Sequence, residues 1–331
     1  MSISADLARS KIIKALSSGD FVSGQRMADD LGLSRSSIAN HVKELSKLGL
    51  DIYRVTGKGY KLSSPIVMIN KDLIQDRLSI NKLNSKQIDV LNVVGSTNDE
   101  IKRNLTNLDK GAVCIAEAQT KGRGRRGRKW VSPYGASIYL SMLWRFERGY
   151  ESISGLSLAV GLAVKRAISA IGYDNVNLKW PNDIYAQNRK LAGILIELEG
   201  QLDGMTEVII GIGINANLPQ VELSIDQDYI DLQSLLNYTV DRNHVCAALI
   251  DELWSILVEF ERSGISPLTN EWLEADLYRN KNVVLMAGKQ SITGICRGID
   301  DSGALLIETA SGLRTFHGGE VSVRSDKNHA S

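Results

Sequence analysis

The stretch QTKGRGRRGRKW, residues 119–130, directly follows an apolar run at residues 111–118 (GAVCIAEA) that reads as a buried strand. It holds six Lys or Arg residues and three glycines, and no apolar residue precedes Trp130. Glycine lets a backbone approach a ligand closely, and arginine presents a planar set of donors that matches phosphate or carboxylate. The pattern predicts a mobile loop that closes over an anion. A solvated basic loop is the alternative.

The bulk composition limits the classes of protein to consider. The chain of 331 residues has room for two or three domains, and its 43% hydrophobic and 23% charged residues are typical of a protein that buries a core. Residues 1–64 carry a formal charge of +4 and the remainder about −3, so nucleic acid is a candidate partner of the N-terminal part alone. We find no apolar run long enough for a transmembrane helix and no signal-peptide core. Three widely separated cysteines predict neither a disulfide framework nor a metal site, so we expect a cytoplasmic protein.

The N-terminal part has the pattern of a winged helix-turn-helix. A first helix is predicted over residues 5–17, and Ser23 and Ser34 can cap two further helices that Gly32 separates. A hairpin with the basic tip TGKG at residues 56–59 follows as the wing. A small helical interaction domain is the alternative, but the helix pair, the wing and the excess of positive charge agree on DNA binding. The predicted DNA contacts are Arg35, Ser36, Asn40, Lys43 and Lys58.

The middle of the chain alternates apolar strands with helices, which predicts an α/β domain with a mixed sheet. One strand begins with Lys190 and is otherwise apolar, so this lysine must meet a counter-charge or a ligand if it is not simply at the surface. Residues 215–231 are polar and aperiodic, which makes them a candidate lid. The predicted strands cover residues 88–91, 111–118, 137–143, 184–186, 190–198 and 207–214, and the predicted helices cover 71–78, 98–105, 154–171, 243–262 and 267–275.

Short strands at a spacing of about ten residues follow residue 282 and predict a small β-barrel. The fold class is therefore α+β with several domains. We predict a winged helix-turn-helix at residues 1–64, an α/β mixed-sheet domain at 65–275 and a small β-barrel at 276–331.

Five segments follow one another in a recognisable order: residues 95–98 (GSTN), 119–130, 179–183 (KWPND), 189–197 (RKLAGILIE) and 211–215 (GIGIN). With them the chain resembles the biotin protein ligases, in the bifunctional form that also represses the biotin operon, and the resemblance covers essentially its whole length. It implies that the domain at 65–275 is a catalytic domain of the class II synthetase/biotin ligase-like fold and that the barrel at 276–331 is SH3-like. The resemblance implies that biotin and ATP form biotinoyl-5′-adenylate, and that biotin then passes to a lysine of the biotin carboxyl carrier protein of a carboxylase. It implies Mg²⁺ with the ATP, operator DNA as a partner, and a homodimer when the adenylate is bound.

The resemblance also implies roles for individual residues. Biotin and the reacting groups would be held by Ser96, Thr97, Asn98, Gln119, Arg123, Gly124, Arg125 and Lys190, of which Arg123, Arg125 and Lys190 are the catalytic candidates. The nucleotide would contact Arg125, Arg128, Trp130, Asn182, Tyr229 and Arg324, and Asp183 is the candidate for the metal. The repressor-type ligases carry a tryptophan that stacks on the adenine in the loop after GIGIN. Here residues 215–232 contain no tryptophan, and Tyr229 takes about that place.

Three other functions fit part of the pattern. A transcription factor that senses a small anion would need the basic loop but no ATP chemistry. A lipoate ligase would share the fold, although such enzymes generally lack the GRGRRG loop. A ligase whose winged helix no longer represses is the third. For the dimer, we expect strands near residues 190–198 and 207–214 to pair side by side between two copies.

Overall fold

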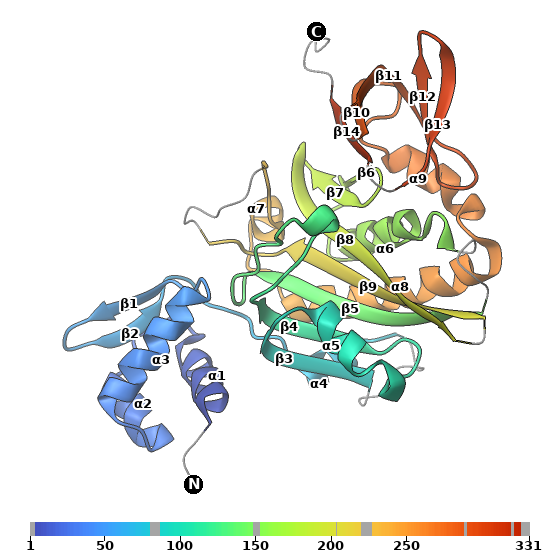
Figure 1. Ribbon diagram of the computed structural model, residues 1–331. Helices are drawn as coiled ribbons and strands as arrows, with labels where there is room; N and C mark the ends of the chain where they lie inside the picture. The colour runs from blue at the N-terminus through green and yellow to red at the C-terminus, as the bar shows by residue number, and fades with distance from the viewer. Residues whose placement is uncertain are drawn as a thin grey trace.

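The computed structural model describes residues 4–79, 87–147, 153–202, 204–219, 227–287, 290–318 and 321–325. In these ranges the chain forms an N-terminal helical unit, a central sheet with helices on both faces, and a C-terminal antiparallel sheet (Figure 1). The predicted α+β organisation is confirmed. Residues 220–226 of the candidate lid lie outside the described residues.

The N-terminal unit is a winged helix-turn-helix. Its helices begin at Ser4, Ser23 and Ser34, and each serine side chain accepts a backbone N–H of the first turn. Gly32 has a φ of 63° and ends the second helix, because glycine adopts this left-handed conformation without strain. The elements are α1 (Ala5–Leu16), α2 (Gly24–Leu31), α3 (Arg35–Lys47), β1 (Ile52–Val55) and β2 (Gly59–Leu62).

The central domain is built on a seven-stranded sheet. Its strand order is β3-β4-β5-β9-β8-β7-β6, with β3 and β4 parallel and the other neighbours antiparallel. The sheet is therefore mixed, as predicted. The strands are β3 (Ile88–Val94), β4 (Val113–Gln119), β5 (Ser137–Phe146), β6 (Asn177–Lys179), β7 (Asp183–Ala186), β8 (Arg189–Leu202) and β9 (Met205–Asn215).

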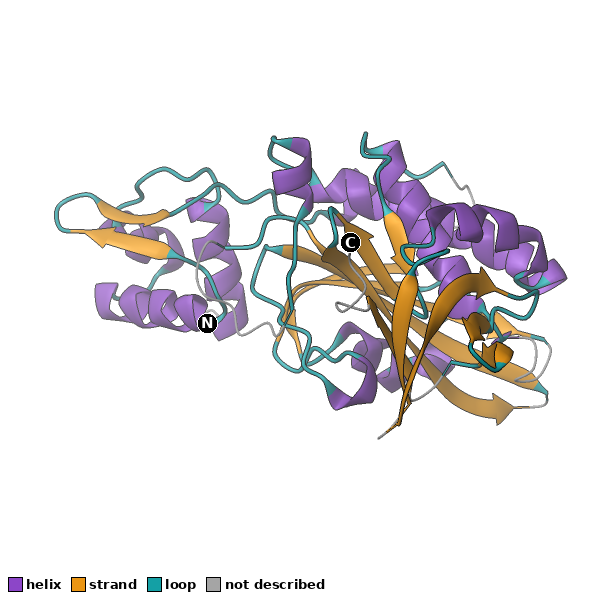
Figure 2. Cartoon of the chain, turned by 90° about the horizontal axis from the view of Figure 1, so that it is seen from above, coloured by secondary structure: helices purple, strands orange, loops and turns teal. Residues whose placement is uncertain are grey.

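Helices cover the two faces of this sheet unequally. The long helices α6 and α8 pack on one face and bury the main core, whereas the short α5 lies on the other (Figure 2). The helix predicted over residues 71–78 is shorter, because α4 ends before Asp76, and α5 stops at Arg103 before a 3₁₀ turn at Leu105–Asn107. The helices are α4 (Lys71–Gln75), α5 (Thr97–Arg103), α6 (Leu156–Ala170), α7 (Leu232–Leu236), α8 (Arg242–Ser263) and α9 (Thr269–Ala275).

The strand pairing corrects one expectation. Strand β9 is hydrogen-bonded along its length to β5 on one side and β8 on the other, so it offers no free edge to a second copy. The expectation that residues 207–214 pair across a dimer is wrong. Strand β8, in contrast, pairs with β7 only as far as Gly193 and runs on to Leu202 with one neighbour among the described strands.

The C-terminal unit is a five-stranded antiparallel sheet in the order β13-β12-β11-β10-β14. Its two outer strands, β13 and β14, do not pair with each other in the residues described, so closure into an SH3-like barrel stays a prediction. Trp180 donates its indole N–H to the carbonyl of Gly303 at 3.1 Å and ties this sheet to the central domain. The strands are β10 (Asn282–Ala287), β11 (Gln290–Ile299), β12 (Leu305–Thr309), β13 (Gly312–Phe316) and β14 (Val321–Ser325).

A buried ion pair anchors the segment that leaves the winged helix. Arg242 of α8 and Glu117 of β4 lie 2.7 Å apart, and their side chains are 3% and 2% exposed. Glu117 accepts the backbone N–H of Ile69, and Arg242 donates to the carbonyl of Val67. The segment that connects the winged helix to the central domain is therefore bound tightly to the strand that leads into the basic loop.

Candidate active site

Part of the sheet face that α5 covers has no side chains, and we call this area the floor. It consists of Gly193 on β8 and of Gly211 and Gly213 on β9. On β9 the buried Ile210, Ile212 and Ile214 alternate with Gly211 and Gly213, so the glycines fall on the face opposite the main core. Gly213 pairs with Gly193 of β8. A Cβ added at Gly213 would lie 2.5 Å from the indole ring of Trp130, and one at Gly193 would lie 3.1 Å from it. The end of the basic loop thus rests directly on the backbone of the sheet.

Four of the predicted biotin-binding residues, Ser96, Thr97, Asn98 and Gln119, lie together at one end of this floor. Gln119 accepts both the backbone N–H of Thr97, at 2.9 Å, and its hydroxyl, at 3.2 Å. Ser96, Thr97 and Asn98 are all at most 5% exposed. The Asn98 amide donates to Glu197 at 2.7 Å and accepts from the Ser141 hydroxyl at 2.5 Å. The amide nitrogen and the amide oxygen of Asn98 are therefore both hydrogen-bonded to other side chains. Thr97 and Gln119 provide the polar groups at this end of the floor.

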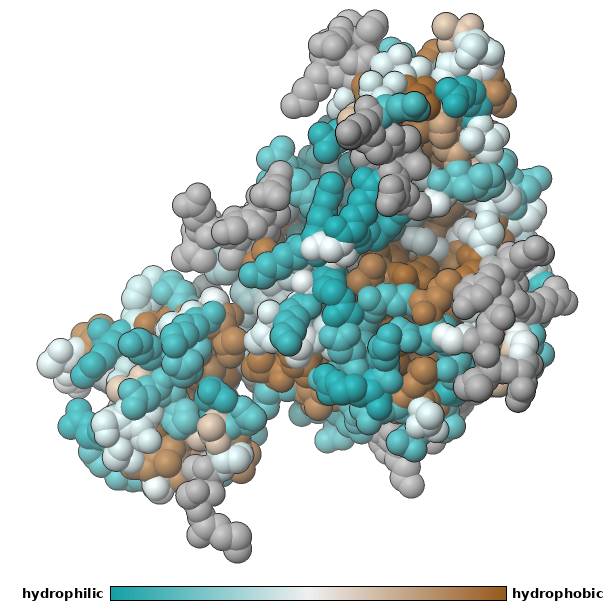
Figure 3. Space-filling model, in the orientation of Figure 1, coloured by the Kyte–Doolittle hydropathy of each residue, from teal (hydrophilic) through white to brown (hydrophobic). Residues whose placement is uncertain are grey.

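The basic loop folds into a tight turn over the sheet. Gly124 donates its N–H to the carbonyl of Arg128 at 2.7 Å, and a 3₁₀ turn spans Arg125–Gly127. The Arg125 guanidinium donates to the side-chain oxygen of Asn182 at 3.0 Å, and burial lowers its pKa. Arg123 contacts the carboxylates of Asp99 and Glu197 instead. In Figure 3 the hydrophilic side chains in the region of this loop border a hydrophobic area over the central strands.

Lys190 meets the counter-charge that its position in a buried strand requires. Its Nζ lies 2.8 Å from Asp183 and 5.4 Å from the centre of the Trp130 ring. Tyr229 is half-buried and forms an isolated parallel bridge with Lys190, in which the backbone of Ile230 donates to the carbonyl of Lys190. The structure therefore brings Trp130, Lys190 and Tyr229 together at the end of the floor away from Gln119.

A second lysine, which the sequence reasoning did not single out, lies beside this group. Lys179 donates to the Tyr185 hydroxyl at 3.2 Å, and its Nζ lies 5.8 Å from the centre of the Tyr278 ring. Burial lowers the pKa of Lys179, Asp183 opposes this shift, and the charges of Lys190, Arg324 and Arg128 add to it. Arg324 and Arg128 therefore add to the positive charge around Lys179.

The predicted DNA contacts form a separate surface. Arg35, Ser36, Asn40 and Lys43 are exposed on α3, whereas Ile38, Val42 and Leu45 are buried on its other side. Lys58 is exposed at the wing tip, and its Nζ lies 5.7 Å from the ring of Phe21. Polar side chains on one helix face beside a basic wing are what a winged helix needs to read a major groove.

Comparison with known proteins agrees with this geometry. The chain is 43% identical over 316 residues to the bifunctional ligase/repressor BirA of Escherichia coli (strain K12), a match that covers 95% of this chain and 97% of the relative. The chain belongs to the biotin protein ligase family. It is a ligase of the bifunctional ligase/repressor type, and the BirA of Bacillus subtilis (strain 168) is 30% identical over 311 residues, covering 91% of this chain and 94% of that protein.

Family models match all three parts of this ligase. The Biotin/lipoate A/B protein ligase family matches residues 90–215, the Biotin protein ligase C terminal domain matches 280–324, and an HTH domain matches 8–61. The structure of the biotin protein ligase from Aquifex aeolicus in complex with biotin and ATP superposes with a TM-score of 0.65 at 31% identity, over 72% of this chain and 99% of that one.

The structure also brings into the site residues to which the sequence analysis gave no role. Gly193 and Gly213 support Trp130, Ser141 orients Asn98, and Asp99 and Glu197 hold Arg123. The alternation of isoleucine and glycine at residues 209–214 was the one available signal for the floor. Within the described ranges no group of three or more His, Cys, Asp or Glu side chains is placed to hold a metal ion, and none of the helices described is long and apolar enough to cross a membrane.

Proposed function

We propose that this ligase joins biotin and ATP to form biotinoyl-5′-adenylate and pyrophosphate, and then transfers biotin to a lysine of the biotin carboxyl carrier protein of acetyl-CoA carboxylase. The observation that carries the proposal is the arrangement of polar and cationic side chains on the α5 face of the sheet. Thr97 and Gln119 offer neutral hydrogen-bonding groups at one end, where a ureido ring would fit. Arg125, Lys179 and Lys190 supply positive charge at the other end, where a carboxylate and a phosphate would meet.

The first reaction brings two anions together. A carboxylate oxygen of biotin attacks the α-phosphorus of ATP, the P–O bond to the β-phosphate breaks, and pyrophosphate leaves. The cationic side chains lower the repulsion between the reactants and stabilise the charge that develops on the phosphate oxygens. Lys190 now pairs with Asp183, so we expect its ammonium group to turn from this carboxylate toward the incoming anions.

The second reaction needs the mixed anhydride to survive until the carrier arrives. The carrier lysine attacks the acyl carbon as a neutral amine, the amide forms, AMP leaves and the amine loses a proton. A basic loop that lies over the sheet excludes water and so protects the anhydride from hydrolysis. Trp130 seals the end of this loop against Gly193 and Gly213.

A magnesium ion fits this site as a companion of ATP. Mg²⁺ is commonly held by one or two carboxylates together with substrate phosphates. Asp183 is the carboxylate beside Lys190 that would hold it. When bound, the ion would neutralise phosphate charge.

Biotin-dependent release of pyrophosphate from ATP tests the enzymatic half. We expect release only when biotin and ATP are both present, and no response to lipoate. A protein that binds biotin without releasing pyrophosphate would be a sensor, and one that prefers lipoate would belong to the related ligases.

We further propose that the winged helix binds a two-fold operator of biotin synthesis genes, with the adenylate as corepressor. A ligand that orders a dimer surface raises the dimer population and, by linkage, the affinity for a palindromic site. The outer part of β8, beyond Gly193, is the candidate edge for such a dimer. Sedimentation should show a larger mass with biotin and ATP, and gel-shift assays should show tighter operator binding. An unchanged mass would contradict ligand-linked dimerisation.

A further inference from the structure

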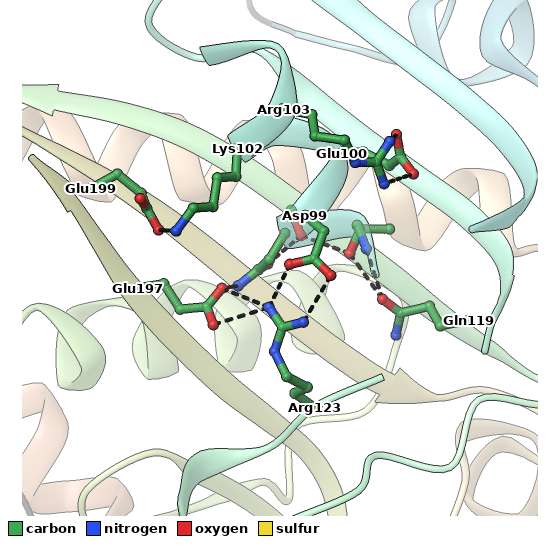
Figure 4. A network of polar contacts seen from close by, with 11 residues as sticks. Asp99, Glu100, Lys102, Arg103, Gln119, Arg123, Glu197 and Glu199 are labelled. Atoms are coloured by element: carbon green, nitrogen blue, oxygen red, sulfur yellow. Dashed lines mark hydrogen bonds and ion pairs between the residues drawn. The ribbon is translucent and has the colours of Figure 1, made fainter. Parts of the chain in front are cut away.

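Arg123 belongs to an ionic cluster that joins three segments of the ligase. Its guanidinium makes a two-pronged contact with Asp99 of α5, at 2.8 and 2.7 Å, and reaches Glu197 of β8 at 3.1 and 3.3 Å. Figure 4 shows Arg123 between these two carboxylates. The contacts connect the basic loop with α5 through Asp99, 24 residues earlier in the chain, and with β8 through Glu197, 74 residues later.

The charges of this cluster disfavour an anionic ligand at Arg123. One guanidinium faces two carboxylates, so the three side chains together are negative. Hydrogen bonding to Arg123 lowers the pKa of Asp99, and Asp99 in turn raises the pKa of Arg123, so both groups are charged at neutral pH. A substrate carboxylate would therefore meet two like charges at Arg123.

We infer that Arg123 is a positioning residue, which latches the closed basic loop to α5 and β8 through Asp99 and Glu197 and does not hold a substrate anion. The inference rests on the proposed function for its kinetic consequence alone. Each opening of the loop must break these contacts, so the latch lowers the population of the open state. Its loss would shorten the lifetime of the bound adenylate and let the backbone of the loop, residues 119–130, leave the sheet more often.

Neighbouring ion pairs provide matched controls. Glu100, the next residue of α5, pairs with Arg103 within the helix. Lys102 of α5 pairs with Glu199 of β8, so it joins the same helix and strand without touching the loop. Neutralising Glu100 or Glu199 removes one carboxylate from the same region but leaves the latch in place.

The test combines limited trypsin digestion with adenylate release. Trypsin cleaves after Lys and Arg, so cleavage within residues 121–129 of the free full-length protein reports loop opening. The dissociation rate of the preformed adenylate, measured by chase with unlabelled biotin and ATP, reports the same opening in the loaded enzyme. The variants are Asp99→Asn, Arg123→Met, both together, Asp99→Ser as a second neutral form, and the controls Glu100→Gln and Glu199→Gln.

We expect Asp99→Asn to raise both rates by about five- to tenfold, as the loss of one charge-assisted, partly exposed pair would. Arg123→Met should match it within about threefold, and the double variant should add little, because both changes remove the same contact. The controls should stay at the wild-type rates, and all variants should keep the wild-type melting temperature within a few degrees.

Two results would overturn the latch. If trypsin cleaved Asp99→Asn and Asp99→Ser at the rate of Glu100→Gln, and adenylate dissociated from all three at the same rate, the cluster would not hold the loop. If Arg123→Met raised the KM for biotin by more than about thirtyfold while Asp99→Asn left it unchanged or lowered it, Arg123 would be an anion ligand. A wild-type protein that forms no adenylate would contradict the proposed function, and the digestion of the free protein would still decide the latch.

Discussion

Replacing Gly213 by alanine should disable the ligase through Trp130. The added Cβ would lie 2.5 Å from the indole ring. An ordinary carbon–carbon contact is about 3.5–4.0 Å, so the ring must retreat by about 1 Å. The ring cannot bend, and its retreat lifts the end of the basic loop from the sheet.

A displacement of this size has a large predicted effect. Misplacing a positioning group by about 1 Å can cost on the order of a hundredfold in rate. We therefore expect kcat/KM for ligation to fall about 30- to 100-fold in Gly213→Ala. Gly193→Ala is the matched control, because its Cβ would lie 3.1 Å from the same ring and asks for a shift of only a few tenths of an ångström. In Gly193→Ala, kcat/KM for ligation should fall by less than about fivefold.

The assay is steady-state transfer of labelled biotin to a carrier domain, with the melting temperature of each variant measured in parallel. The graded loss, large at Gly213 and small at Gly193, follows from the two distances. Equal activities of the two variants, or a larger loss at Gly193, would refute the idea that Trp130 must lie flat on this floor.

Three further changes test other parts of the structure. Burial raises the pKa of Asp276 from 3.8 to about 6, so its contribution to stability is complete below pH 3.8 and is lost as the pH rises through 6. Asp276→Asn should remove this loss, worth about 1–3 kcal/mol, in denaturant titrations between about pH 3 and 7. Phe21→Ala removes the ring that contacts Lys58 and Lys61 of the wing and should weaken operator binding about three- to tenfold in fluorescence anisotropy. Leu7→Ala, at another exposed apolar residue on α1, should leave operator binding unchanged. Arg242→Met leaves Glu117 as an unpaired buried charge and should destabilise the protein by about 3–5 kcal/mol in urea unfolding; a loss below 1 kcal/mol would mean that Glu117 finds another partner.

Local signals in the sequence predicted the elements well. Ser23 and Ser34 marked helix starts that the structure confirms, and Gly32 marked the turn between them. The basic loop was recognisable because six cations and three glycines without an apolar residue fit no buried element. The placement of Lys190 at the start of an apolar strand correctly required a counter-charge.

Contacts between distant segments were not predictable in the same way. Asp99 reads as an ordinary acidic residue in the first turn of a helix, and only the tertiary fold brings Arg123 to it. The pairing of Gly193 with Gly213 depends on strand register, which a one-residue shift would abolish. The dimer edge was misjudged at residues 207–214 because an apolar strand looks the same whether it is central or at an edge.

Transfer of labelled biotin to an apo carrier domain tests the central claim most directly. With biotin and ATP, the wild-type ligase should label the single acceptor lysine, and a carrier with that lysine replaced should stay unlabelled. Lys190→Ala and Arg125→Ala should each lower the labelling rate at least about a hundredfold, as the loss of a preorganised charge at the reacting anions would. Labelling by both variants at the wild-type rate would contradict the assignment of the site, and an unlabelled carrier with the wild-type protein would contradict the function itself.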